Sequence, residues 1–140
     1  MQLQNRLKND EKYKRISQER ELILSKAQKS LSTIFCCNLD HTFKHERTIR
    51  TLQRGAKLEL DQHHDEILVK SGFHIVGKIP KNIEKEIDQL FLERRSYKAT
   101  ILSILGRDGS EFQTSTIIEN GQEKVLKHLG IEILIEFPII

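Results

Sequence analysis

Apolar residues recur at every second position in several short segments, and this alternation predicts β-strands with one buried face. Residues 57–60 and 66–70 are two such segments, joined by a polar tip at residues 61–65. Residues 73–79 follow a Ser-Gly turn signal and predict a third strand, and residues 97–105 predict a fourth. These four strands are the centre of the predicted fold.

A helix is predicted between the third and fourth strands. Pro80 suits its first turn, where the missing N–H removes no hydrogen bond. Apolar side chains then recur at helical spacing, at Ile83, Ile87, Leu90 and Phe91. One stripe of this helix is therefore expected to pack on the strands.

A longer helix is predicted for residues 3–34, because neither Pro nor Gly occurs before Gly55. Its apolar stripe is thin in the first half and thicker in the second. The thicker part consists of Leu24, Ala27, Leu31 and Ile34. We therefore expect residues 22–35 to pack on the body of the protein, and the first dozen residues to project or fray.

The C-terminal part is predicted to continue with a hairpin turn at residues 106–109, whose Asp-Gly pair tolerates positive φ. An antiparallel strand at residues 111–119 follows. A break at residues 120–121 precedes a short helix at residues 122–129. Residues 131–137 form the last predicted strand, with apolar side chains on one face and glutamates on the other.

The chain has 140 residues, of which 31% are charged and 37% hydrophobic, as is typical of a folded domain. No apolar run approaches the roughly 20 residues that cross a bilayer, and the N-terminus lacks an apolar signal-peptide core. We therefore expect an intracellular protein of the cytoplasm, nucleoid or nucleus that is not secreted. Cys36 and Cys37 are adjacent and have no other cysteine to pair with, so we expect a buried pair of small apolar thiols.

The net charge of +3 is small, but the basic residues are unevenly distributed. One basic region is residues 1–35. The other is a cluster in which Glu46 is the only acidic residue, and it consists of Lys44, Arg47, Arg50, Arg54 and Lys57. Such clusters either attract phosphate groups or are ordinary solvated faces.

Motifs for catalysis are weak in this sequence. It has neither the Gly-x-Ser-x-Gly motif of hydrolases nor a P-loop. A metal-dependent nuclease is disfavoured because Glu66 and Lys70 are too far apart on an extended strand to share one site. His41 and His45 have the spacing of zinc ligands on a helix, but no third ligand is placed by spacing. We therefore expect no enzyme activity, no metal and no cofactor, with these histidines solvated or facing DNA.

The central unit resembles a HIRAN domain in four short motifs. They are residues 52–60, with a glycine before the strand, residues 65–69, which read Asp-Glu-Ile-Leu-Val, residues 76–81, which read Val-Gly-Lys-Ile-Pro-Lys, and residues 99–101 after the helix. The resemblance covers about half of the chain. It implies an α+β fold, a small OB/SH3-like antiparallel β-barrel with one or two packed helices, here preceded by the long N-terminal helix. Residues 1–35 would be an assembly or docking helix, and residues 36–140 the barrel domain with a C-terminal helix–strand extension.

HIRAN domains capture single-stranded DNA ends and favour a free 3′-hydroxyl, so the resemblance implies a DNA-binding accessory protein. Such contacts need a basic rim, aromatic faces and an acceptor for the terminal hydroxyl. By motif, Arg47 would be a rim cation, Asp65 the buried acceptor and Lys81 a phosphate contact, with His64 or Phe73 as a stacking face. The candidate nucleic-acid contacts are Arg47, Arg50, Arg54, His64, Asp65, Phe73, Lys78 and Lys81.

The DNA-end loop departs from the family pattern. Its Pro and Asn are missing, His64 precedes Asp65, and Lys78 replaces the usual aromatic residue or histidine. Two hypotheses follow. In the first, the barrel contacts single-stranded DNA or DNA ends. In the second, the protein is a non-enzymatic interaction subunit that joins a larger complex, or a second copy of itself, through residues 1–35.

Overall fold

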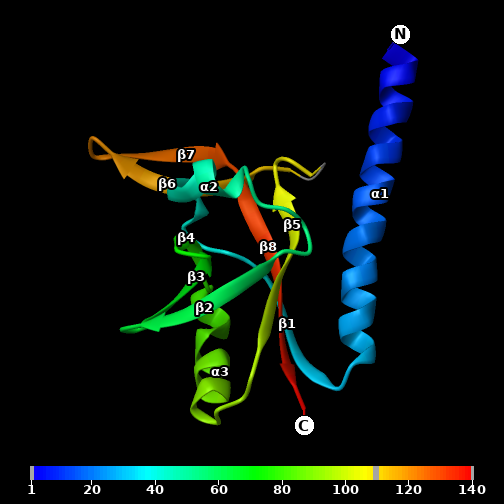
Figure 1. The fold of residues 1–140 in the computed structure, drawn as a ribbon. Helices are drawn as coiled ribbons and strands as arrows, with labels where there is room; N and C mark the ends of the chain where they lie inside the picture. Colours follow the sequence, from blue (N-terminus) through cyan, green and yellow to red (C-terminus); the bar gives the residue numbers. More distant parts are fainter. Residues whose placement is uncertain (1, 109–110, 140) are drawn as a thin grey trace.

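The computed structural model describes residues 2–108 and 111–139 and combines three α-helices, one 3-10 helix and eight strands (Figure 1). In chain order the elements are α1 (Gln2–Lys29), β1 (Ser32–Asn38), the 3-10 helix η1 (Thr42–His45), α2 (Glu46–Ile49), β2 (Lys57–His63), β3 (Glu66–Ser71), β4 (His74–Lys78), α3 (Lys81–Leu92), β5 (Lys98–Leu105), β6 (Gln113–Glu119), β7 (Gln122–His128) and β8 (Gly130–Pro138).

Six strands form one antiparallel sheet in the order β1-β8-β5-β2-β3-β4, and β6 and β7 form a separate two-stranded sheet. The predicted α+β fold with antiparallel strands is confirmed, but the predicted closed barrel is wrong. Within residues 2–108 and 111–139, the edge strands β1 and β4 are connected by a single bridge between Asp40 and Lys78. The pairing stops there because His41 has a left-handed φ of 60° and turns the chain into η1.

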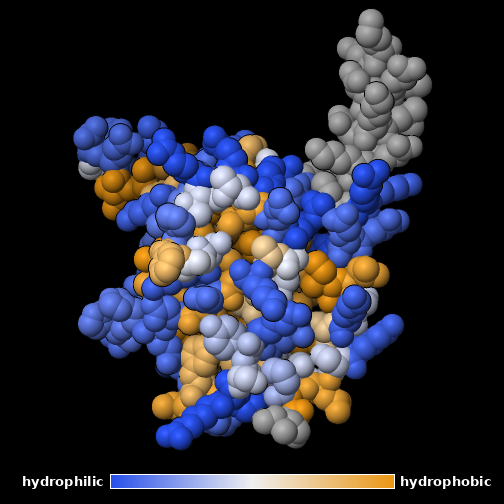
Figure 2. Space-filling model, in the orientation of Figure 1, coloured by the Kyte–Doolittle hydropathy of each residue, from blue (hydrophilic) through white to orange (hydrophobic). Residues whose placement is uncertain are grey.

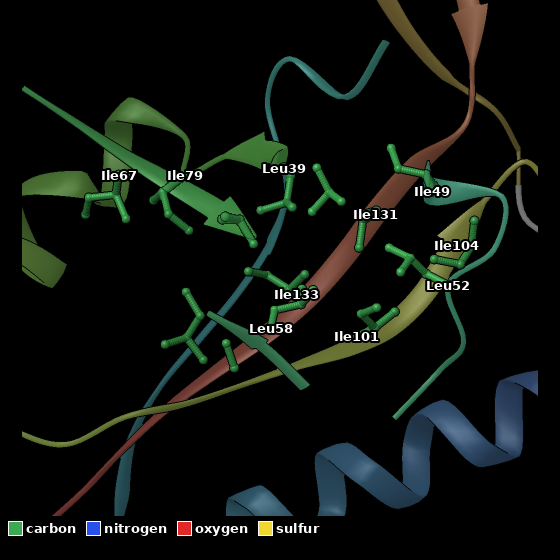
Figure 3. Packing of buried hydrophobic residues seen from close by; sticks show 14 of the residues in the cluster. Leu39, Ile49, Leu52, Leu58, Ile67, Ile79, Ile101, Ile104, Ile131 and Ile133 are labelled. Atoms are coloured by element: carbon green, nitrogen blue, oxygen red, sulfur yellow. The ribbon is translucent and has the colours of Figure 1, made fainter. Parts of the chain in front are cut away.

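The six-stranded sheet curls around one hydrophobic core. Ile131, Ile133 and Ile135 of β8 are fully buried, as their alternation predicted. α3 packs its predicted apolar stripe on this core, with Ile87 fully buried. Figure 3 shows side chains from β8, β5, β3 and the segments around α2 converging on the same core. The core therefore fixes the positions of β4 and α2, on which the candidate site stands.

The N-terminal helix ends earlier than predicted. α1 stops at Lys29, and Ser32–Asn38 form β1, which pairs with β8 along its whole length. β1 therefore runs across the predicted division between a helical region and a separate barrel. α1 stands beside the sheet (Figure 1), where Ala27 is buried against Leu102 and Leu134.

An ion pair joins α1 to the sheet. Arg20 of α1 donates to both carboxylate oxygens of Glu132 on β8, with Nε–Oε1 at 2.6 Å and Nη2–Oε2 at 2.8 Å. Ser103 donates a further hydrogen bond to the same carboxylate at 3.1 Å. The Arg20 guanidinium holds the pKa of Glu132 below its usual range, although partial burial opposes this shift. The charged form of Glu132 therefore stabilises the docked helix.

We expect Glu132→Gln to weaken the docking of α1 by about 1 kcal/mol. This is the usual contribution of a hydrogen bond to a charged group, reduced because the pair is partly exposed to solvent. Because the folded-state pKa of Glu132 is lowered, its contribution is present above the unfolded-state value and is lost as pH falls below about 4. The NMR shift of the Ala27 methyl group, measured against pH, tests both statements. Glu21, which contacts Arg20 from an exposed position at 3.1 Å, provides the control, and Glu21→Gln should leave that shift unchanged.

The cysteines are not the buried pair that the sequence predicted. Both lie on β1, where Cys36 is exposed and Cys37 is partly buried. Neighbouring residues of a strand point to opposite faces, so both cannot enter one core. Burial raises the pKa of the Cys37 thiol to about 12, which keeps it protonated at neutral pH.

The region after β5 differs most from the prediction. The predicted helix at residues 122–129 is wrong, because Gln122–His128 form β7 and pair with β6 in a hairpin. Asn120 and Gly121 have φ values of 53° and 76°, which is the two-residue type I′ turn. The predicted hairpin turn at residues 106–109 is also wrong: β5 pairs with β8 and β2 rather than β6, and Gly109 itself lies outside the described residues.

A buried polar network anchors the base of the β6–β7 hairpin. His128 is 2% exposed; its Nδ1 lies 2.8 Å from the Leu129 carbonyl, and its Nε2 lies 2.7 Å from Ser115 Oγ. Because a carbonyl can only accept, Nδ1 carries the proton and Nε2 accepts from the Ser115 hydroxyl. Gln113 accepts from Thr42 of η1 at 3.1 Å and donates to the Leu39 carbonyl at 2.9 Å. The hairpin is thus attached to the chain that enters η1.

Candidate nucleic-acid interface

A basic and aromatic segment follows β1, at residues 41–50. Buried Thr42 and Ile49 anchor this segment to the body. Lys44, Arg47 and Arg50 are consequently held on its exposed side. Within the part of the chain that the structure describes, neither Arg47 nor Arg50 forms an ion pair. Their charges are therefore available to an anionic ligand.

An aromatic ring accompanies these cations. The ring of Phe43 is partly exposed, and Lys44 Nζ lies 5.7 Å from its centroid. Phe43 also meets the ring of buried His128 edge-on, with the centroids 5.9 Å apart. This is the geometry that aromatic pairs prefer, and it helps to hold the Phe43 ring in place.

The segment crosses over β4 at Gly77. The Asp40 N–H donates to the Lys78 carbonyl at 2.8 Å, and the Lys78 N–H donates to the Asp40 carbonyl at 2.9 Å. A Cβ atom on Gly77 would lie 2.9 Å from the Asp40 oxygen, so only glycine allows this approach. Because the two chains are antiparallel, α2 continues alongside β4 toward its start. Phe73 immediately precedes that start and is 100% exposed.

Two further cations lie at the other end of β4. Lys78 forms an ion pair with Glu66 of β3, with Nζ–Oε1 at 2.7 Å. The pKa of Glu66 is lowered mainly by Lys78, and the nearby charges of Lys81 and His41 lower it further. His41 begins the basic segment, and the segment therefore approaches β4 at its Lys78 end.

We call this surface the basic strip and define it by its side chains. It consists of His41, Phe43, Lys44, Arg47, Arg50, Phe73, Lys78 and Lys81. In Figure 1, β4 lies between the β6–β7 and β2–β3 hairpins, and Figure 2 shows two protrusions on that side of the molecule with the surface set back between them. Phe73, in the turn before β4, is 100% exposed and projects from the body.

Arg54, one of the predicted contacts, lies elsewhere. It pairs with Glu19 of α1 at 2.6 Å and with Asp108, at the end of β5, at 3.3 Å. Its side chain is only 21% exposed. Arg54 therefore braces α1 against the body and is not free to bind phosphate.

His64 and Asp65 occupy the turn between β2 and β3. His64 has a φ of 55°, and its ring lies 4.4 Å from that of His63. Asp65 is exposed, whereas the resemblance implies a buried acceptor at this position. Of the eight predicted contacts, the structure gathers Arg47, Arg50, Phe73, Lys78 and Lys81 around β4 and leaves Arg54, His64 and Asp65 outside the strip.

Sequence reasoning missed Phe43 and Glu66. The signal for Phe43 was present, because it stands between a histidine and a lysine in a run of basic residues. The position of Glu66 beside Lys78 depends on the β3–β4 pairing, which the sequence does not specify at the level of side chains.

No family model, no curated protein and no solved structure matches this chain. Among the residues that the structure describes, no helix is both long and apolar enough to cross a membrane. Within the same residues, no group of three or more His, Cys, Asp or Glu side chains could hold a metal ion.

Proposed function

We propose that this chain is a nucleic-acid-binding accessory protein whose basic strip contacts single-stranded DNA or DNA ends. One observation carries the proposal: Lys44, Arg47 and Arg50 are exposed beside Phe43, on a segment held rigidly across β4. Cations neutralise phosphates, and aromatic rings stack on bases whatever their sequence. Duplex DNA hides its bases in the stack, so an aromatic strip suits a single strand.

The resemblance to HIRAN domains supports the same proposal. Its Val-Gly-Lys-Ile-Pro-Lys motif, at residues 76–81, includes the glycine that lets the basic segment cross β4. The exposed Asp65 argues against a buried pocket for a terminal hydroxyl. We therefore propose that contact with the strand itself contributes more affinity than capture of its 3′ end.

Fluorescence anisotropy with labelled single-stranded oligonucleotides tests this function. We expect binding at low salt that weakens steeply as salt rises, with a log–log slope of about 0.7 per neutralised phosphate. Arg47→Gln combined with Arg50→Gln should reduce that slope by about 1.4, because two phosphate contacts are lost. Comparing a 3′-hydroxyl with a 3′-phosphate shows whether the end itself is read.

The matched control removes two positive charges from α1, as Lys26→Gln with Lys29→Gln, both exposed and distant in sequence from the strip. This control should leave the slope unchanged. Equal effects of the two double variants would mean that binding follows net charge and not the strip. Absence of binding by the unaltered protein at low salt would refute the function.

A second candidate function rests on α1. Leu22 of α1 is 63% exposed, and Leu31, in the turn between α1 and β1, is 80% exposed, as expected of a surface that also contacts a partner or a second copy. Concentration-dependent association, measured by light scattering, should then fail in Leu22→Glu. Removing residues 1–35 is unsuitable as a test because it would delete part of β1.

A further inference from the structure

We propose that Glu66 is a built-in competitor for the phosphate position of the basic strip, so that a nucleic-acid phosphate must displace its carboxylate from Lys78. The inference rests on the proposed function and adds a regulatory contact to the same site. It assigns Glu66 an inhibitory role, whereas Lys78 and Lys81 supply the attraction.

The geometry around Glu66 is that of an anion already bound. Its carboxylate accepts from Lys78 Nζ at 2.7 Å. Lys81, at the start of α3, and His41, after β1, are close enough for their charges to act on it as well. Lys78 of β4 therefore holds the carboxylate directly, and the charge of Lys81 on α3 acts on it as well. A carboxylate has the charge of a phosphodiester and similar acceptor oxygens.

A second ion pair, on the neighbouring β2–β3 hairpin, provides a comparison with an ordinary pair between adjacent strands. Asp61 of β2 accepts from Lys70 of β3, also at 2.7 Å. Asp61 and Glu66 have nearly equal exposure, 45% and 43%. The charges acting on Asp61 come from Lys70 and His63 of the same hairpin, whereas those acting on Glu66 include α3 and the basic segment. The two pairs thus match in distance and exposure and differ in surroundings.

Displacement requires only side-chain motion. The backbone of Lys78 is fixed by its two hydrogen bonds with Asp40. The Lys78 side chain is 19% exposed, while the Glu66 side chain is 43% exposed. Glu66 can therefore swing into water and leave Lys78 in place, where it donates to a phosphate oxygen instead. No bond is made or broken other than this exchange of ionic hydrogen bonds.

Glu66→Gln, with Asp61→Asn as its matched control, tests the proposal in the full-length chain. We expect Glu66→Gln to bind a single-stranded oligonucleotide about two- to fivefold more tightly than the unaltered protein, the effect of one charge at a partly exposed site. Asp61→Asn should bind as the unaltered protein does. An equal gain with 3′-hydroxyl and 3′-phosphate oligonucleotides identifies a backbone phosphate at this position, and a gain confined to the 3′-phosphate identifies a terminal one.

The possible outcomes distinguish the competitor role of Glu66 from the proposed nucleic-acid binding by the basic strip. If Glu66→Gln gains no more than Asp61→Asn, while the Arg47 and Arg50 substitutions still weaken binding, the competitor role alone is refuted. If neither the unaltered protein nor Glu66→Gln binds, both proposals fail.

Discussion

Phe137→Ala is expected to lower the free energy of unfolding by about 3–5 kcal/mol, the usual cost of removing a fully buried phenylalanine. Phe137 of β8 is 0% exposed. Its ring centroid lies 6.0 Å from that of Phe35 on β1, 5.9 Å from Phe91 on α3 and 6.2 Å from Tyr97 before β5. One ring therefore packs against both the edge strand β1 and α3 and joins them to the centre of the sheet. Urea denaturation of the unaltered protein and of Phe137→Ala measures the difference in their free energies of unfolding.

Phe73→Ala makes the same chemical change at a position that is 100% exposed. Its stability should stay within about 0.5 kcal/mol of the unaltered protein, while its affinity for a single strand should fall if Phe73 stacks on a base. The pair of variants separates folding from binding. Equal losses of stability at both positions would contradict the packing described for Phe137.

The strands that the sequence predicted well are those with clear alternation of apolar and polar residues. In β8, Ile131, Ile133 and Ile135 enter the core, while the other face holds the partly buried Glu132 and Glu136 and packs Leu134 under α1. β7 was mistaken for a helix because its lysines, glutamate and leucine are good helix formers. The neighbouring Asn-Gly turn carried the decisive signal, and a hairpin with an exposed outer face needs no strong alternation.

β1 was hidden for a different reason. Its residues 32–38 continue the apolar spacing of α1, and nothing local ends the helix at Lys29. The strand forms because β8, about a hundred residues later, provides the backbone hydrogen-bonding partners for antiparallel pairing. Tertiary pairing of this range overrides local propensity and cannot be read from a short window.

The candidate site was predictable to the extent that it depends on composition. The basic cluster around Arg47 was visible in the sequence, and so was the Ser-Gly turn signal directly before Phe73. Which cations are free was not visible, because charge pairing is decided by tertiary neighbours. Arg54 is neutralised by Glu19, which is 35 residues away, while Arg47 and Arg50, in the same cluster, remain exposed.

Gly77→Ala is expected to destabilise the protein by about 1–3 kcal/mol, the cost of an overpacked contact. Its new Cβ would lie 2.9 Å from the Asp40 oxygen and 3.0 Å from the Leu39 Cβ, and the first of these is a backbone atom that cannot rotate away. The crossing segment must then lift from β4, which strains the paired hydrogen bonds between Asp40 and Lys78. Hydrogen exchange at these two amides should accelerate together.

Gly72→Ala is the control for this change. Nothing lies within 4 Å of its Cβ position, so its cost comes only from a φ of +62° and amounts to about 1–2 kcal/mol. Exchange at Asp40 and Lys78 should not respond to it. Because the basic segment follows Asp40 directly, Gly77→Ala should also weaken single-strand binding more than Gly72→Ala does. Slow exchange at both amides in Gly77→Ala would mean that the crossing accommodates the added Cβ, which would contradict the predicted clash.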